Sequence, residues 1–266
     1  MLPFGARGVH IEMNTRRVFL GLPMLAAAVP AAEAALPSAF PSQDPDMVRE
    51  VVGASHFNLA RVKELVSAHP ALAKASWDWG FGDWETALGA ASHTGQRDTA
   101  LLLLDHGAPA TIFSAAMLGQ LHVVRGFLGA SPGIQKIKGP HGITLMAHAL
   151  AGKEAAADVV TFLESSGNAD EQPTLAPLSA DEQQLLSGIY SFGSGPADKL
   201  EVKVTRGNLT VSRIKGAPRN LFHLGSHAFY PAGADAVRVR FTVADGKAKL
   251  LTVHDPGLLV TAERQP

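Results

Sequence analysis

The stretch TALGAASHTGQRDTALLLLDHGAP, residues 86–109, decides the fold of this chain because it holds two short helical patterns with a tight turn between them. Leu88 and Ala91 belong to a narrow face of small residues that recurs at helical spacing. Gly95 interrupts this pattern, and a more apolar pattern follows it and ends before Gly107. Glycine is the residue that most often ends a helix. The stretch therefore predicts two short helices joined by a turn.

Similar helical pairs recur on both sides of this stretch, at residues 51–70, 112–131 and 142–167. The helical pairs end at residues 70, 107, 131 and 167, so the intervals are 37, 24 and 36 residues. This recurrence resembles the ankyrin-type repeat family, whose period is about 33 residues, and the resemblance covers residues 46–169. It implies an α-solenoid of about four repeats, a scaffold that binds other proteins. The family's T-P-L-H motif reads T-A-L-G at residues 86–89, so we expect weaker helix capping and marginal repeat stability.

The repeats are unevenly spaced, and the spacing predicts where loops lie. Residues 108–111 join the second and third repeats directly, whereas residues 71–83 and 132–141 are longer than a repeat requires. Insertions in solenoids gather on one face, which is often the binding face. These two insertions therefore indicate where a binding surface lies.

The composition changes at residues 173–178, which are rich in proline and typical of a linker after a repeat domain of residues 35–172. Ser179 and Glu182 form a capping box that opens a short helix. Beyond it, apolar and polar residues alternate in about eight short runs, as in antiparallel strands. Two dipeptides between these runs predict hairpin turns: Gly207-Asn208 and Asp245-Gly246.

Strand closure removes exposed edges, so these runs predict a small closed barrel or a curved sheet over residues 179–266. The predicted fold is α+β with two domains. A short α-solenoid of ankyrin-like repeats is followed by a small antiparallel β-barrel-like domain.

The C-terminal half also resembles the lipocalin-like β domain that accompanies β-lactamase-related serine hydrolases. The resemblance rests on LSGIY at residues 186–190, KVTRGNLTV at residues 203–211 and VRFT at residues 239–242. It implies a fold and not an activity, because that domain is an accessory to the catalytic one. An alternative function is the binding of a small apolar ligand inside the barrel. Large side chains are expected to fill the interior instead: Phe222, Phe229, Tyr230 and Phe241.

Composition and charge exclude several classes of function. The chain has 266 residues, of which 46% are hydrophobic and 18% are charged, as in an ordinary soluble globular protein. The formal net charge of -1 gives no reason to expect nucleic acid or an anionic membrane as a partner. Residues 35–172 hold 9 basic and 14 acidic residues and residues 173–266 hold 11 and 8, so docking of the two oppositely charged domains is a reasonable hypothesis. The absence of cysteine excludes disulfides and thiolate catalysis.

The first residues resemble a twin-arginine export signal. Residues 14–20, NTRRVFL, place paired arginines before an apolar run that is too short to span a bilayer permanently. Ala-Glu-Ala at residues 32–34 matches a cleavage site, and Met13 is an alternative start. The resemblance implies export to the periplasm or the cell exterior, with no membrane association once residues 1–34 are removed.

Two matches to hydrolase motifs have the wrong context. G-x-S-x-G at residues 129–133 requires a strand before the serine, but Ser131 follows a repeat helix. S-x-x-K at residues 212–215 falls on an expected strand, where residues three apart point to opposite faces. We therefore expect a non-catalytic protein without a cofactor, and a hydrolase is the least favoured function.

Histidines recur at equivalent repeat positions. His56 and His93 share one position, with Met117 next in the series, and His69 and His106 share another. Equivalent positions in neighbouring repeats stack, so the two imidazoles of a pair could approach a common ion. Two histidines without a carboxylate make a weak metal site, however. We expect these histidines to bond to carbonyls at helix ends, and we expect no metal.

The best candidate for a functional segment is WDWGFGDWE, residues 77–85, which holds every tryptophan of the chain within one insertion. Aromatic side chains beside glycines and acidic groups are concentrated in protein interfaces. The alternative is that these aromatic residues fill the gap between the first two repeats. The expected function is recognition of an unidentified protein through repeat loops and inner helices, at Trp77, Trp79, Phe81, Trp84, His93, Met117 and His141.

Overall fold

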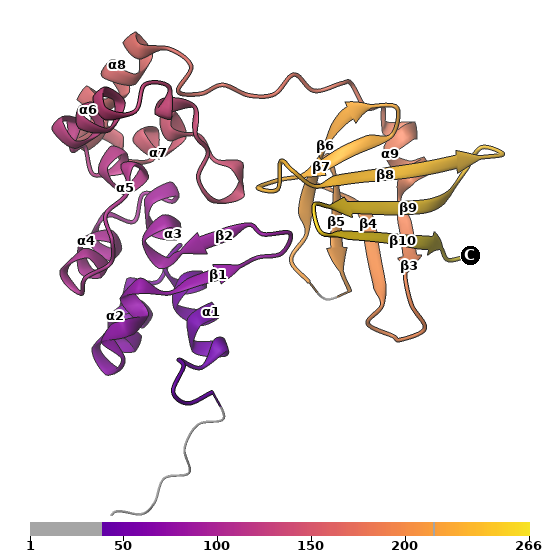
Figure 1. Ribbon diagram of the computed structural model, residues 1–266, viewed down its shortest axis with the longest axis horizontal. Helices are drawn as coiled ribbons and strands as arrows, with labels where there is room; N and C mark the ends of the chain where they lie inside the picture. The colour runs from indigo at the N-terminus through magenta and orange to yellow at the C-terminus, as the bar shows by residue number, and fades with distance from the viewer. Residues whose placement is uncertain (1–38, 215) are drawn as a thin grey trace, which may run out of the picture. The chain divides into compact units, whose positions relative to one another are not determined.

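The computed structural model describes residues 39–214 and 216–266, which fall within one compact unit. It combines short helices with a closed antiparallel β-barrel, so the mixed helix-and-sheet composition predicted from the sequence is confirmed (Figure 1). The expected export signal, residues 1–34, lies outside the described residues. In the two described ranges, no helix has the length and apolar character needed to cross a membrane.

Short α-helices follow one another in pairs over the first half of the described chain. The helices expected within residues 86–109 are confirmed as α3 and α4, and Gly95 between them has a φ of 68°, a left-handed conformation that favours glycine. The pairs are α1 (Pro45–Ala54) with α2 (Leu59–Ala68), α3 (Ala87–His93) with α4 (Arg97–Asp105), α5 (Ile112–Met117) with α6 (Leu121–Ala130), and α7 (Leu145–Ala151) with α8 (Ala157–Ser166). Short 3-10 segments accompany them: η1 (Pro70–Lys74), η2 (Ile134–Lys136), η3 (Pro140–Gly142) and η4 (Lys153–Ala156).

Threonine side chains cap the start of the first helix in three of these pairs. The hydroxyl oxygens of Thr86, Thr111 and Thr144 each accept a hydrogen bond from a backbone N–H of the first turn, at 2.9, 3.1 and 3.2 Å. A cap of this kind contributes about 1 kcal/mol. The weak capping expected from the T-A-L-G sequence is therefore not found at these N-caps, because the threonine alone supplies the acceptor.

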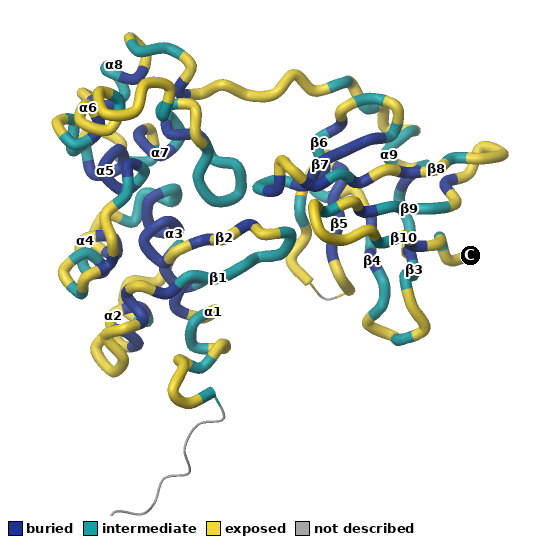
Figure 2. Tube along the Cα trace, viewed as in Figure 1, coloured by how far each residue is buried: buried dark blue, intermediate teal, exposed yellow. Residues whose placement is uncertain are grey.

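Helix α3 is enclosed along its length, whereas its partner α4 is buried only on one face (Figure 2). Ala90 and Ala91 are fully buried, and their small side chains let neighbouring helices approach closely. Helices α1 to α4 contribute most of one apolar core, and α5 to α8 contribute most of a second. Side chains at the ends of α3 are thus held in a tightly packed region.

The insertion expected as a loop over residues 71–83 has regular structure. Its first part contains η1, and β1 (Ser76–Asp78) then pairs with β2 (Trp84–Thr86) in an antiparallel hairpin that places Trp77 opposite Glu85. The expectation of a loop is therefore wrong for most of this segment. Since β2 leads directly into α3, side chains of β2 lie beside the start of that helix.

The barrel begins after α9 (Ala180–Leu186), which opens with the expected capping box between Ser179 and Glu182. Its strands close in the order β10-β3-β4-β5-β6-β7-β8-β9, and every neighbouring pair is antiparallel. The closed barrel predicted from the alternating pattern is confirmed. The strands are β3 (Gly188–Ser191), β4 (Lys199–Thr205), β5 (Asn208–Arg213), β6 (Arg219–Gly225), β7 (Ala228–Pro231), β8 (Arg238–Ala244), β9 (Lys247–Asp255) and β10 (Leu258–Arg264).

Two details of the barrel differ from the sequence predictions. Asn208 pairs with Thr205, so the first hairpin turn lies at Arg206 and Gly207, one residue earlier than expected. The turn at Asp245-Gly246 is confirmed, because its neighbours Ala244 and Lys247 pair.

The aromatic residues expected inside the barrel are divided between two sets. Phe229 and Phe241 belong to the barrel core and meet edge to face, with ring centroids 5.6 Å apart. Phe222 and Tyr230 pack on each other at 5.1 Å and lie outside that core. Successive strand residues point to opposite faces, so the prediction that all four residues fill the barrel is wrong for Phe222 and Tyr230.

Candidate metal centre

A fully buried carboxylate lies at the base of the hairpin. Glu85 is the central residue of β2, and its side chain is 0% exposed because alternation along the strand turns it inward between two exposed neighbours. Its oxygens accept hydrogen bonds from the indole Nε1 of Trp79 at 2.7 Å and from Nε2 of His93 at 2.9 Å. Burial of a charge in this way is costly unless the charge is paired.

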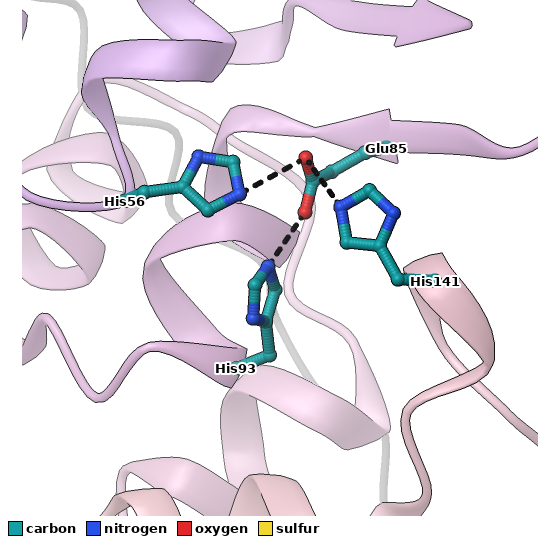
Figure 3. A group of neighbouring side chains, drawn as sticks. All are labelled: His56, Glu85, His93 and His141. Atoms are coloured by element: carbon teal, nitrogen blue, oxygen red, sulfur yellow. Dashed lines mark hydrogen bonds and ion pairs between the residues drawn. The ribbon is translucent and has the colours of Figure 1, made fainter. Parts of the chain in front are cut away.

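Three imidazoles surround this carboxylate, and each comes from a different part of the helical region (Figure 3). His56 follows α1, His93 ends α3, and His141 lies in η3. The Nε2 atoms of His56 and His141 are each 3.4 Å from Oε2 of Glu85, whereas His93 contacts the other carboxylate oxygen, Oε1. One donor atom from each of the four residues lies within 4.8 Å of the other three.

Outer contacts fix the direction of two of these rings. The Nδ1–H of His56 donates to the Gly53 carbonyl at 3.0 Å, and the Nδ1–H of His141 donates to Asp83 at 2.7 Å. Asp83 also accepts from the backbone N–H of His141 and from the guanidinium of Arg219. A histidine that binds a metal commonly donates its other N–H to a carbonyl or a carboxylate in this manner. Both rings therefore present Nε2 to the interior of the group.

The spacing of the donors suits a small cation. Donors about 2.1 Å from a tetrahedrally coordinated ion are about 3.4 Å from one another. The Nε2 atoms of His56 and His141 are 3.4 Å from Oε2 of Glu85, which matches this edge length, and Nε2 of His93 is 2.9 Å from the other oxygen, Oε1. The four donor atoms lie within 4.8 Å of one another, which is wider than this edge length, so the group would have to contract around a bound ion.

The protonation of this group in the absence of an ion follows from its charges. Burial opposes protonation of His141, but the hydrogen bonds and charges of Asp83 and Glu85 outweigh it and raise the pKa of His141 to about 9. Burial likewise opposes the charged form of His56, and Glu85 raises its pKa above the ordinary range. The hydrogen bonds from the three histidines hold the pKa of Glu85 far below its usual value despite burial. Protons and a metal ion would therefore compete for the same nitrogens.

A further histidine lies behind the group. His148 on α7 is fully buried, its ring centroid is 6.1 Å from that of His93, and neither ring nitrogen has a hydrogen-bond partner among the described residues. Burial is the main cause that lowers the pKa of His148 to about 3. It is thus a neutral neighbour of the centre and not one of the four grouped donors.

The residues expected at a binding surface have different locations. His93 and His141 both join the group around Glu85, and Trp79 bonds to that carboxylate. Met117 is 1% exposed and lies in the apolar core, so its side chain does not reach a surface. Trp77 packs against the same core, Phe81 packs against the barrel core, and Trp84 is 62% exposed.

Repeat spacing paired His56 with His93 but did not point to the carboxylate between them. A metal site was not expected because no carboxylate ligand had been recognised, and Glu85 supplies that ligand. Glu85 lies between two outward-facing residues of a short strand, and this alternation is the sequence signal that would have placed its side chain inside. His106 has the helix-end role that was expected, since its Nδ1 bonds the Leu102 carbonyl at 2.9 Å.

Comparison with known proteins adds no assignment. No protein-family model matches the chain, and no curated protein matches it at a significant level.

Proposed function

We propose that this protein binds one divalent transition-metal ion through His56, Glu85, His93 and His141. The observation that supports this function is the convergence of three imidazole Nε2 atoms on one buried carboxylate. Imidazole suits zinc, copper, iron and nickel, and a mixed set of histidine and carboxylate is common to such sites.

Charge balance alone does not account for this arrangement. One protonated imidazole would neutralise Glu85, and Arg219 already lies against Asp83. Three imidazoles around a single carboxylate exceed that requirement, and two of them are oriented by outer partners. This excess of aligned nitrogen donors favours an ion over a purely structural ion pair.

Metal uptake by the full chain tests the proposal. The protein would be stripped with a chelator, dialysed at neutral pH and titrated with Zn²⁺ or Co²⁺, with elemental analysis of the product. We expect one equivalent to bind. Loss of a ligand in Glu85→Gln or His93→Ala is expected to weaken binding by more than the roughly 10–100-fold that loss of an outer partner costs.

His106→Ala is the matched control, because this histidine also ends a helix but lies outside the group. It is expected to bind the ion as the wild type does. Absence of stoichiometric uptake, or equal losses in the control and ligand variants, would show that the cluster is only a charge network.

Recognition of another protein is a second candidate function, and the exposure of Trp84 favours it. This indole is 62% exposed although the next residue is buried, and exposed aromatic side chains are frequent anchors of interfaces. In this proposal the helix pairs form an ankyrin-like solenoid in an exported protein, with export directed by the twin-arginine pattern. The protein is then a non-catalytic binding module.

The helical region and the barrel are proposed to be two domains that dock on each other. Arg219 on β6 donates to Asp83 in the hairpin, and Lys138 lies 3.6 Å from Asp235. The opposite net charges of the two halves support this contact. A small apolar ligand remains the alternative for the barrel, and a mainly apolar pocket of about 400 Å³ that includes Phe192 and Val211 supports it.

A further inference from the structure

The four grouped donors are unequally enclosed. The side chains of Glu85 and His93 are 0% and 10% exposed, whereas those of His56 and His141 are 22% and 30% exposed. The two more exposed rings line an open cleft of about 330 Å³ together with Trp79. An ion held by all four donors would therefore be closed off by protein on the side of Glu85 and His93, and it would face the cleft between the other two rings.

Four protein donors fill the coordination positions of a tetrahedral ion, so an external ligand needs a fifth position, as in sites that expand to five-coordinate. We infer that the ion in this centre keeps such a position toward the cleft and binds the carboxylate group of a small organic acid there. The inference rests on the proposed metal site and adds the chemical class of its ligand.

Charge favours an anion at this position. Three neutral imidazoles and one carboxylate leave a divalent ion with one net positive charge. The neighbouring Asp83 does not cancel this charge, because the guanidinium of Arg219 lies against it. One anionic carboxylate bound to the ion would therefore make the site neutral.

The wall of the cleft provides hydrogen-bond donors for an anion, although the charge of Arg219 is already balanced by Asp83. Arg219 lines the cleft, and its Nη1 is fixed by hydrogen bonds to Asp83 and to the Ala232 carbonyl. A guanidinium held in place suits the planar carboxylate group. The amide of Asn220 lies in the same wall.

The remaining walls suit a carbon skeleton. Trp79 provides an aromatic ring, and Ala217 and Pro218 provide apolar surface. A volume of about 330 Å³ is near the lower limit of pockets that hold small molecules. These walls favour a small organic acid over an inorganic anion, which would have no group to contact them.

The test uses the full chain loaded with Co²⁺, whose visible spectrum reports its ligands. Acetate, benzoate and inorganic phosphate would be added separately. We expect saturable spectral changes with acetate and benzoate, and tighter binding of benzoate because its ring contacts the apolar wall.

A variant that fills the cleft separates this binding from metal uptake. Ala217→Phe places a large side chain in the cleft without altering a grouped donor, and we expect it to retain Co²⁺ but to weaken benzoate by roughly tenfold or more. Ala71→Phe, at an exposed alanine outside the cleft lining, is the matched control and should respond as the wild type does.

Each outcome is decisive. A Co²⁺ spectrum that none of the anions changes would show that the site is closed and would overturn the inference while leaving the metal site intact. A response to phosphate that equals or exceeds the response to benzoate would overturn the choice of an organic acid. Failure to bind Co²⁺ at all would overturn both this inference and the proposed function.

Discussion

The barrel and the helical region bury different kinds of side chain. The barrel core is built from apolar residues such as Phe229 and Leu251, both 0% exposed, whose burial stabilises the fold directly. The helical region also has apolar cores, but it encloses two carboxylates and an imidazole, Asp83, Glu85 and His148, whereas the described part of the barrel encloses one ionisable imidazole, His223. Buried ionisable groups are poor contributors to stability, and local departures from the rules of a stable core concentrate at functional sites. The functional site is therefore expected in the helical region.

The largest expected effect lies in the barrel. Phe229→Ala removes a fully buried ring from its core and should lower the free energy of unfolding by about 3–5 kcal/mol. Chemical denaturation would measure this loss. Phe222→Ala is the control, since this ring lies outside the core and should cost less. Equal costs would mean that the barrel does not depend on the inward face of its strands.

The next effect distinguishes an oriented metal centre from a cluster of charges. Asp83→Asn keeps the size of the side chain but removes the negative charge beside Nδ1 of His141, so metal affinity should fall roughly 10–100-fold. Competition with a chromogenic chelator would measure it. Asp78→Asn is the control, because that carboxylate caps the Gly80 N–H and is not among the grouped donors. A similar loss in both variants would contradict the role given to Asp83.

The two regions also differ in how far their sequence predicts them. Alternation with a period of two is a local property, so it located the strands of the barrel and missed one hairpin turn by a single residue. The helix pairs were found in the same way, from spacing at helical period. What alternation did not decide is which rings enter the core, as Phe222 and Tyr230 show.

The metal centre could be predicted only in part. His56 and His93 were related by their repeat positions, but Glu85 follows the insertion at residues 71–83 and His141 ends the insertion at residues 132–141. The path of an insertion is set by tertiary packing, and neither a three-residue strand nor the left-handed conformation of His141, with φ of 60°, has a periodic signal. Repeat spacing therefore paired two donors, His141 was predicted only as part of a binding surface, and Glu85 was missed.

A smaller effect concerns acid stability. Burial, together with the charge of His93, lowers the pKa of His148 from an ordinary value of 6.5 to about 3. The unfolded chain thus binds a proton at His148 at a higher pH than the folded chain does. The stability that comes from keeping His148 neutral is therefore fully present above pH 6.5 and is lost as the pH falls toward 3. The expected loss is about 1.4 kcal/mol for each pH unit below pH 6.5.

Thermal unfolding between pH 7 and pH 5 would measure this loss. His148→Leu keeps an apolar side chain of similar bulk at the site and should make the curve flatter, because the buried base is gone. His106→Ala, which removes a partly exposed histidine from a helix end, should leave the slope of the wild type. An unchanged slope in His148→Leu would show that other groups cause the acid sensitivity.

The smallest effect on stability comes from Trp84, and this makes it the best probe of protein recognition. Its ring is 62% exposed, so Trp84→Ala should change the free energy of unfolding by no more than about 0.5 kcal/mol. Trp77 is less suitable, because it packs against the apolar core and its removal would alter the fold as well. If the hairpin anchors a partner, Trp84→Ala should lose a protein that the wild-type chain retains from a periplasmic extract.

Phe57→Ala is the matched control for this experiment, since Phe57 is an aromatic residue that is 75% exposed outside the hairpin. Retention of the partner by this control and its loss from Trp84→Ala would localise recognition to the hairpin. Retention by both variants would remove Trp84 from any binding surface. Because Glu85 points inward from the same strand, metal binding should be unchanged in Trp84→Ala, so the two faces of β2 can be tested independently.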